Sequence, residues 1–298
     1  MHRRHFIGAT SAAALAPSFA PALASAAEPP IAGELKRLTE PGRDDNRATY
    51  MPDGQSILFA SRRSGRSQIW SMQPDGSGAR HLHESSANDF GRVAPNPAGT
   101  RLCFGSDRSG QSAVHVLDLQ GGAVTTLSDT AWWSFGPSWS ARGLIAYFSR
   151  KGGNQINLWT VQPDGTQARQ ISNQPGESRQ PWWSPDGATL AYSADQGTKA
   201  FQVWLAAPDN TGARALTAAG DWQQPFWSPD GRRLAVSAKV DGPRFRILVI
   251  DLASGQARPI QQPAEADNVH PAWSPDGRRI VFTSGAGESA ALWLFSFA

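Results

Sequence analysis

The chain carries the sequence PFWSPDG at residues 225–231, followed by the alternating apolar run RRLAVSA at residues 232–238. Proline presets its own φ at the first corner of a β-turn, Asp bonds to the local backbone, and Gly accepts the positive φ that closes the turn. An aromatic residue precedes the turn and an alternating strand follows it. The stretch therefore predicts two short antiparallel strands joined by a tight turn.

The same turn recurs along the chain at a nearly constant period. Two close copies are PWWSPDG at residues 181–187 and PAWSPDG at residues 271–277. Alignment on the proline, or on the residue in its place, gives copies 45, 44, 44, 44 and 46 residues apart, anchored at Pro52, Pro97, Ala141, Pro185, Pro229 and Pro275. Six such copies of four strands each are typical of a propeller. We predict an all-β fold, a six-bladed β-propeller of four-stranded antiparallel blades.

The two ends of the chain complement each other. The last copy stops at Ala298, after its third strand. Residues 35–39, LKRLT, match residues 213–217, ARALT, which form a fourth strand in their own copy. We therefore expect the N-terminal strand at residues 33–40 to complete the last blade and close the ring.

The first residues indicate an export signal. Arg3 and Arg4 form a twin-arginine pair, an apolar stretch covers residues 9–24, and the small residues ASA at 24–26 offer a cleavage site. We expect residues 1–26 to be a twin-arginine-type signal peptide that is removed after export to the periplasm.

A membrane anchor is the alternative for this segment. The apolar stretch is short for a membrane span and contains Pro17 and Pro21, which favours cleavage. Residues 27–298 are then expected to form a single propeller domain. We expect it to be monomeric and not integral to the membrane.

The net charge gives no sign of a nucleic-acid partner. Without the two signal arginines, 26 of the 28 Lys and Arg remain against 25 Asp and Glu, which is close to neutral. Cys103 is the single cysteine and is expected to fill space in the core.

Tryptophan is abundant, with 12 residues, and most of these recur at fixed offsets in the repeat. Such regularity favours packing between blades over an array of sugar-binding rings. Trp132, Trp133 and Trp222 fall outside the register. These three are predicted to lie in connecting loops, where they are candidates for contact with a ligand.

Candidate functional residues lie just before the first strand of each copy. This segment opens on the face opposite to the repeated turns, where irregular loops commonly carry function. Eight residues before the anchors, five of the six side chains are acidic, and the residues five before the anchors are mostly cationic or amide. If the first strand lines the axis, these side chains surround the channel mouth. The predicted ligand-binding set is Asp44, Arg47, Asp89, Arg92, Trp133, Glu177, Arg179, Gln180, Asp221, Trp222, Gln224, Asp267 and His270.

This set has two interpretations. The acids can cap turns and pair with arginines between blades, which needs no ligand. Alternatively, the set forms a polar funnel for a charged peptide loop or a small ligand. The loops between the second and third strands would then add a basic rim made by Arg62, Arg63, Arg66, Asp107, Arg108, Arg150 and Lys151.

Motifs for catalysis or metal binding are not found in the sequence. It has no HExxH, GxSxG or P-loop pattern and no cysteine pair for zinc. The run HLHE at residues 81–84 falls on a polar outer strand without further ligands nearby in the sequence. We expect no catalytic residue, no metal and no cofactor.

The six Trp-Ser-Pro-Asp-Gly-type repeats, over residues 33–298, resemble the WD-like repeats of TolB-type β-propellers of the periplasmic Tol-Pal envelope system. The same turn occurs in tricorn-like and dipeptidyl-peptidase-like propellers and in oligogalacturonate lyases. The resemblance implies docking of an envelope protein or peptide loop at the channel mouth. TolB has an α/β domain before its propeller, for which the present sequence leaves only about seven residues, so the functions of that domain are not carried over.

An enzyme is the alternative. A lyase or hydrolase acting on an acidic oligosaccharide would use His270, Arg92 and Arg179 as carboxylate-binding or catalytic groups. Lyases of this kind resemble seven-bladed propellers with several metal-bound histidines, and that difference favours a non-enzymatic binding or scaffolding role.

Overall fold

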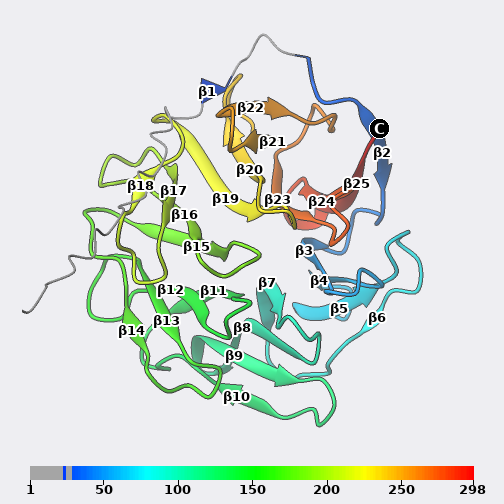
Figure 1. Cartoon of the computed structure of the whole chain (residues 1–298). Helices are drawn as coiled ribbons and strands as arrows, with labels where there is room; N and C mark the ends of the chain where they lie inside the picture. Colours follow the sequence, from blue (N-terminus) through cyan, green and yellow to red (C-terminus); the bar gives the residue numbers. More distant parts are fainter. Residues whose placement is uncertain (1–22, 25–28) are drawn as a thin grey trace, which may run out of the picture.

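The computed structural model describes residues 23–24 and 29–298. Six sheets stand side by side around a central axis, as Figure 1 shows in a view along that axis. Within the described residues the only helix is the short 3₁₀ helix η1 (Gly287–Ser289). The predicted all-β, six-bladed propeller is confirmed.

The blades follow one another in chain order, and each is antiparallel. Blade 1 consists of β3 (Asn46–Tyr50), β4 (Ile57–Ser61), β5 (Gln68–Met72) and β6 (Arg80–His81). Blade 2 consists of β7 (Asp89–Pro95), β8 (Arg101–Ser109), β9 (Gln111–Asp118) and β10 (Val124–Thr126). Blade 3 consists of β11 (Ser134–Trp139), β12 (Ile145–Ser149), β13 (Asn157–Val161) and β14 (Arg169–Gln170).

The second half of the ring repeats this order. Blade 4 consists of β15 (Ser178–Trp183), β16 (Leu190–Ala194), β17 (Gln202–Ala206) and β18 (Arg214–Ala215). Blade 5 consists of β19 (Asp221–Trp227), β20 (Arg233–Lys239), β21 (Arg246–Asp251) and β22 (Gln256–Pro259). Blade 6 consists of β23 (Asn268–Trp273), β24 (Arg279–Ser284), β25 (Ala291–Phe297) and β2 (Gly33–Arg37).

The repeated turn is held by its own side chains. In blade 5, the Gly231 amide donates to the Ser228 carbonyl over 2.9 Å, and Gly231 has the positive φ of 68° that this turn requires. The Ser228 hydroxyl donates to Asp230 and accepts from the Arg233 amide. The turn thus fixes the register of the strands on either side.

Aromatic and aliphatic side chains fill the space between neighbouring blades. Trp183, Trp227 and Trp273 are all less than 9% exposed, as expected for packing residues. The Trp227 indole also donates to the Trp182 carbonyl of the preceding blade over 3.2 Å. Cys103 is fully buried, which confirms its predicted place in the core.

The innermost strands β3, β7, β11, β15, β19 and β23 contact one another around the axis. Each has a register shift against its partner strand, and in five blades one residue at the shift adopts the left-handed conformation five places before the turn anchor. A bulge of this kind changes the direction in which a side chain points. The five residues are Arg47, Gly136, Gln180, Gln224 and His270.

The ring closes through the N-terminal strand. All five residues of β2 pair with β25, and the Leu38 amide continues the ladder to the Leu292 carbonyl over 2.8 Å. The Leu292 amide in turn donates to the Thr39 hydroxyl over 3.0 Å. The predicted closing strand is confirmed.

The predicted signal peptide lies mostly outside the described residues, and this includes Arg3 and Arg4. Its described part is β1 (Leu23–Ala24), which pairs in parallel with β22. Among the described residues, no helix has the length and apolar character that a membrane crossing requires.

Deletion of residues 33–40 is expected to abolish cooperative unfolding. The loss removes one full edge of blade 6 and exposes the unpaired edge of β25. Circular dichroism and tryptophan fluorescence during urea denaturation would then give broad, non-coincident transitions. As a control on the same strand, Glu34→Gln changes an exposed side chain and should leave the transition unchanged. A truncated protein that melts like the full chain would show that β2 does not close the ring.

Candidate functional site

A small cavity of about 80 Å³ lies on the axis, on the side of the propeller away from the repeated turns. Each blade contributes the residue five places before its anchor to the lining, and these residues are Arg47, Arg92, Gly136, Gln180, Gln224 and His270. The structure therefore brings together five of the thirteen predicted residues, all of these except Gly136, which was not in the predicted set. We call this space the mouth cavity.

Hydrogen bonds between blades fix the wall of the mouth cavity. The Gln180 side-chain carbonyl accepts from the Gln224 amide over 3.1 Å, and the Gln224 side-chain carbonyl accepts from the His270 amide over 2.7 Å. The Arg47 amide donates to the Thr283 hydroxyl over 3.0 Å. Each of these bonds joins a side chain of one blade to the bulged backbone of the next.

Arg92 is a buried cation without a counterion among the described residues. It is 8% exposed, and its guanidinium carbon lies 5.2 Å from the centre of the Trp182 ring and 5.0 Å from that of Phe226. Its Nη2 atom is buried and has no hydrogen-bond partner within residues 23–24 and 29–298. Burial, followed by repulsion from Arg47, lowers the pKa of Arg92 to about 9, so the side chain is charged at neutral pH.

His270 stands beside the two arginines as a neutral ring. Burial first, and then the charges of Arg47 and Arg92, hold its pKa well below the usual histidine range. Its Nε2 atom lies 3.1 Å from Gln224 Nε2, and its Nδ1 atom has no hydrogen-bond partner in the part of the chain that the structure describes. Neither ring nitrogen therefore adds a positive charge to the mouth cavity at neutral pH.

Blade 3 departs from the polar pattern. Gly136 takes the bulge position, where a Cβ atom would lie 2.3 Å from the Phe148 ring. Phe148 and Phe135 line the mouth cavity, and Trp133 stacks on Phe135 at 5.7 Å. One side of the mouth cavity is thus aromatic, and the Arg47 guanidinium approaches the Phe135 ring across it at 5.8 Å.

The acids eight places before the anchors are engaged by other groups. Asp44 pairs with Arg62 at 3.5 Å, Asp221 with Lys239 at 3.3 Å, and Glu177 with Arg179. The Asp267 carboxylate accepts from the Phe245 amide over 2.7 Å. The ion pairs join residues of one blade and not of adjacent blades, which corrects that part of the structural interpretation.

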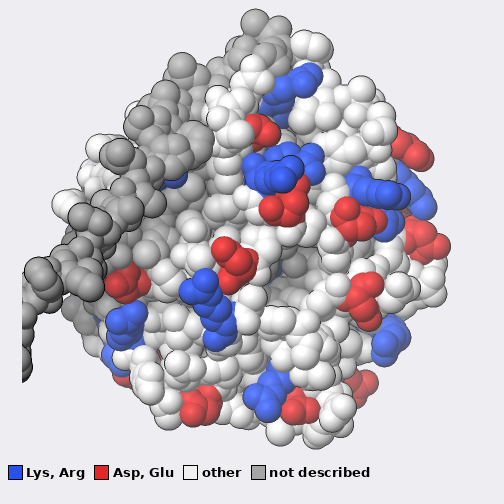
Figure 2. Space-filling view, in the orientation of Figure 1, with Lys and Arg blue, Asp and Glu red and all other residues white. Residues whose placement is uncertain are grey.

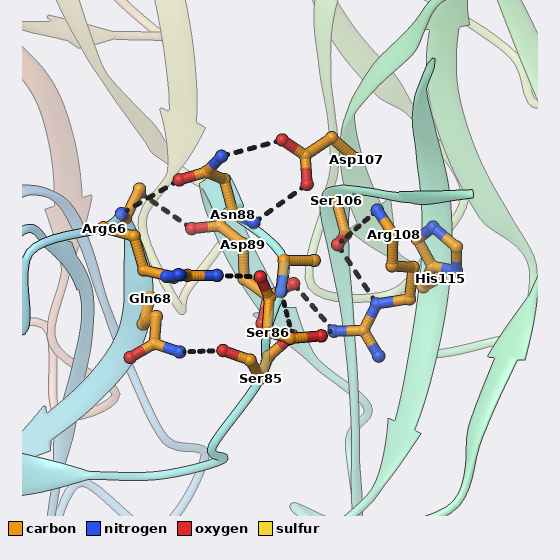
Figure 3. A network of polar contacts seen from close by, with 12 residues as sticks. Arg66, Gln68, Ser85, Ser86, Asn88, Asp89, Ser106, Asp107, Arg108 and His115 are labelled. Atoms are coloured by element: carbon orange, nitrogen blue, oxygen red, sulfur yellow. Dashed lines mark hydrogen bonds and ion pairs between the residues drawn. The ribbon is translucent and has the colours of Figure 1, made fainter. Parts of the chain in front are cut away.

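Asp89 belongs to a polar network at the junction of blades 1 and 2, which Figure 3 shows from close by. Its side chain is fully buried and accepts from Arg108 Nη2 over 2.7 Å, while Arg108 Nε donates to Ser106. Asn88 forms two bonds of 2.8 Å with Asp107. This network holds the segment that enters β7.

Sequence reasoning missed the equivalent pair in blade 1. Asp45, next to the predicted Asp44, is fully buried and pairs with Arg63 at 2.6 Å. Arg63 also donates to Ser61 over 2.9 Å, as Arg108 does to Ser106. A Ser-x-Arg pattern at the end of the second strand of these two copies was the available signal.

The three tryptophans outside the register lie in different environments. Trp132 is 37% exposed and lies in the loop that enters blade 3. Trp133 packs against Phe135 and Phe148. Trp222 does not lie in a loop but within β19, where it is 3% exposed and belongs to a hydrophobic cluster, so its ring is not available at the surface.

Charge and metal-ligand geometry restrict what this region can hold. On the face that Figure 2 shows, acidic and basic side chains are interspersed and form no large patch of one sign. In the described part of the chain, no group of three or more His, Cys, Asp or Glu side chains is placed to hold a metal ion. His81, from the HLHE run, packs instead on the Trp70 ring at 4.0 Å.

Comparisons with known proteins agree with this architecture. The family model for the TolB β-propeller domain matches residues 31–185 and 183–297. A TolB homologue from Chlorobium luteolum is 31% identical over 139 residues, which are 47% of this chain and 31% of that protein. The Tol-Pal system protein TolB from Nitratidesulfovibrio vulgaris is 38% identical over 52 residues, 17% of this chain and 12% of that protein. The matched segments thus span less than a third of either relative.

Solved structures share the fold at low sequence identity. TolB from Acinetobacter baumannii has a TM-score of 0.64 at 17% identity, covering 86% of this chain and 63% of that one. An oligogalacturonate lyase in complex with manganese gives 0.62 at 16%, covering 90% and 94%. A gluconolactonase from Xanthomonas campestris gives 0.68 at 15%, covering 95% and 99%. At these identities the similarity shows the fold alone.

Asp89→Ala is expected to destabilise the protein by about 3–5 kcal/mol, because it leaves the Arg108 charge without its buried partner. The matched control is Asp221→Ala, whose ion pair with Lys239 is partly exposed and should contribute no more than about 1 kcal/mol. Chemical denaturation of both variants measures the difference. Equal effects would show that the Asp89 pair is not a structural anchor.

Stability should fall as the pH drops from about 6.5 towards 4. Burial, and then the charge of Arg108, lower the pKa of the His115 imidazole to about 4 in the folded protein. As the pH falls, the imidazole is therefore protonated in the unfolded chain at a higher pH than in the folded chain, which favours unfolding. The unfolding free energy should lose about 2–3 kcal/mol from this residue across the window. In His115→Gln, the loss of unfolding free energy between about pH 6.5 and 4, measured by denaturation at several pH values, should be smaller by this amount. If the unfolding free energy of the variant depends on pH as that of the wild type does, His115 is not the residue responsible.

Proposed function

The chain belongs to the TolB β-propeller family, and on this premise we propose that it is a non-enzymatic periplasmic binding propeller that docks an envelope protein or peptide loop at its channel mouth. The matched segments cover less than a third of the TolB relatives, so their wider role in the Tol-Pal system is part of this proposal. The twin-arginine pair in the sequence supports export, and with it the periplasmic location.

One observation carries the docking proposal. Four non-glycine residues adopt a positive φ at equivalent places in their blades and line the mouth cavity. They are Arg47, Gln180, Gln224 and His270. A non-glycine residue in this conformation costs on the order of 1 kcal/mol or more and persists where surrounding contacts enforce it. Such strain clusters at binding sites, and here it presents a polar side chain from each of four blades to the axis.

The outer residues of the predicted set suit a rim around this cavity. Arg179 and Asp221 are partly exposed, and each is held by one ion pair within its own blade. Trp132 adds an exposed aromatic surface on the same side of the ring. Exposed tryptophan and arginine are the residue types that dominate protein interfaces.

An enzyme acting on an acidic oligosaccharide is the second candidate, and the cationic lining of the mouth cavity favours it. However, the lining has no carboxylate, whereas hydrolysis of a glycosidic bond generally needs two, which argues against a hydrolase. A lyase does not share this requirement and is addressed by the turnover assay. Docking is therefore the preferred function. Turnover of oligogalacturonides by the purified protein, with or without manganese, would reverse this preference.

Site-specific crosslinking tests the docking proposal. A photoreactive amino acid in place of Trp132, in protein incubated with periplasmic extract of the source bacterium, is expected to give a discrete crosslinked product identified by mass spectrometry. The same residue in place of Arg232, which is exposed beside the repeated turn, is the control.

The double variant Arg179→Ala, Asp221→Ala should reduce the product from the Trp132 position at least about tenfold, since both removed groups belong to partly exposed pairs with little effect on stability. Equal yields from the two crosslinking positions, or a yield that the double variant leaves unchanged, would overturn docking at the mouth.

A further inference from the structure

We propose that the mouth cavity binds a carboxylate group of the docked partner, held between Arg47 and Arg92. The inference rests on the proposed docking function and names the chemistry that the site recognises. It follows from the charges, the hydrogen-bonding capacity and the size of the cavity.

The lining of the mouth cavity carries a positive charge. Among the described residues, the lining contains two guanidinium groups and no acid. Asp44 lies near enough to favour the charged form of Arg47, but its carboxylate is already engaged by Asn46 at 2.9 Å and by Arg62 at 3.5 Å. A buried cation without a partner is costly, and an anion in the cavity would remove that cost.

Arg92 is placed to bind an anion. The rings of Trp182 and Phe226 lie about 5 Å from its guanidinium carbon, which keeps the group enclosed and positioned. Its Nη2 atom is nevertheless buried and forms no hydrogen bond with any described residue. An Arg fork with free N–H groups matches the two oxygens of a carboxylate.

The remaining polar groups of the cavity are donors. The Gln180 carbonyl accepts from the Gln224 amide and from Ser193, and the Gln224 carbonyl accepts from the His270 amide and from Ser237. Two donors fill the two lone pairs of each oxygen. The Gln180 side-chain amide and one N–H of Gln224, whose Nε2 atom already lies 3.1 Å from His270 Nε2, are therefore left as donors, which suits an ionised carboxylate because it is an acceptor only.

The size of the cavity limits the ligand to a few atoms. Its volume of about 80 Å³ is well below the roughly 300 Å³ at which pockets for small molecules begin. Phe135 and Phe148 form an apolar wall beside the arginines. A carboxylate attached to one or two methylene groups fits both features, as in an acidic side chain or a chain end.

Calorimetric titration of the full chain with small probes tests this inference. N-acetylglutamate α-methylamide represents an acidic side chain, N-acetylglycine represents a chain end, and N-acetylglutamine α-methylamide is the neutral counterpart. We expect at least one of the two carboxylates to bind, and the one that binds identifies the source. The neutral amide should bind at least about tenfold more weakly.

Two variants assign the binding to the cavity. Arg92→Met and Arg47→Gln should each weaken carboxylate binding at least about tenfold, whereas Arg232→Met, which removes an exposed arginine beside the repeated turn, should not. Arg92→Met should also melt at a higher temperature than the unliganded wild type, because it removes an uncompensated buried charge. This readout shows directly that the variant is folded.

The inference is overturned if the neutral amide binds as well as the carboxylates, if both arginine variants bind like the wild type, or if neither peptide carboxylate binds. Binding of galacturonate alone would likewise overturn it and would favour the oligosaccharide candidate. Crosslinking at position 132 tests the docking proposal separately from carboxylate binding in the mouth cavity. A crosslinked partner without carboxylate binding refutes only this inference, and carboxylate binding without a crosslinked partner refutes only docking.

Discussion

Packing between blades is the constraint on which the whole structure depends. A four-stranded blade has two apolar faces and cannot bury either of them alone, so each blade needs a neighbour on both sides. Closure of the ring meets this need for all six blades at once. The pairing of β2 with β25 is therefore a condition of the fold, because it gives blade 6 the fourth strand that its own segment of chain lacks.

The residues that repeat from blade to blade support this packing, whereas the residues that differ between blades line the mouth cavity. The turn at Gly231 and the buried Trp227 have equivalents in most copies, which is why they specify the ring and not a ligand. At the bulge position the copies differ in chemistry but share the backbone conformation. A common geometry with variable side chains produces an asymmetric cavity, cationic towards blades 1 and 2 and aromatic towards blade 3.

The sequence carried the fold almost completely, since the turn, its period and the strand alternation are local signals. It also placed the residues around the axis, because the offset from each anchor is constant. It could not separate the engaged acids from the free cations: whether Asp89 or Arg92 has a partner depends on Arg108, Trp182 and Phe226, which lie on other strands. The loop position predicted for Trp222 was wrong for a related reason. Strand β19 begins earlier than the repeat suggested, and Trp222 is therefore part of the strand and packs in the core.

The Gln224 amide donates to the Gln180 side chain and the His270 amide donates to the Gln224 side chain, so both hydrogen bonds have the same direction around the ring. In each, the side chain of one blade holds the backbone of the following blade, and so the wall has a polarity. A change of residue at one bulge therefore has its first structural effect on the blade that comes after it and not on the one before. Gln180, Gln224 and His270 are therefore coupled in chain order, and the effect of a substitution at one of them is expected to depend on the residue at the next.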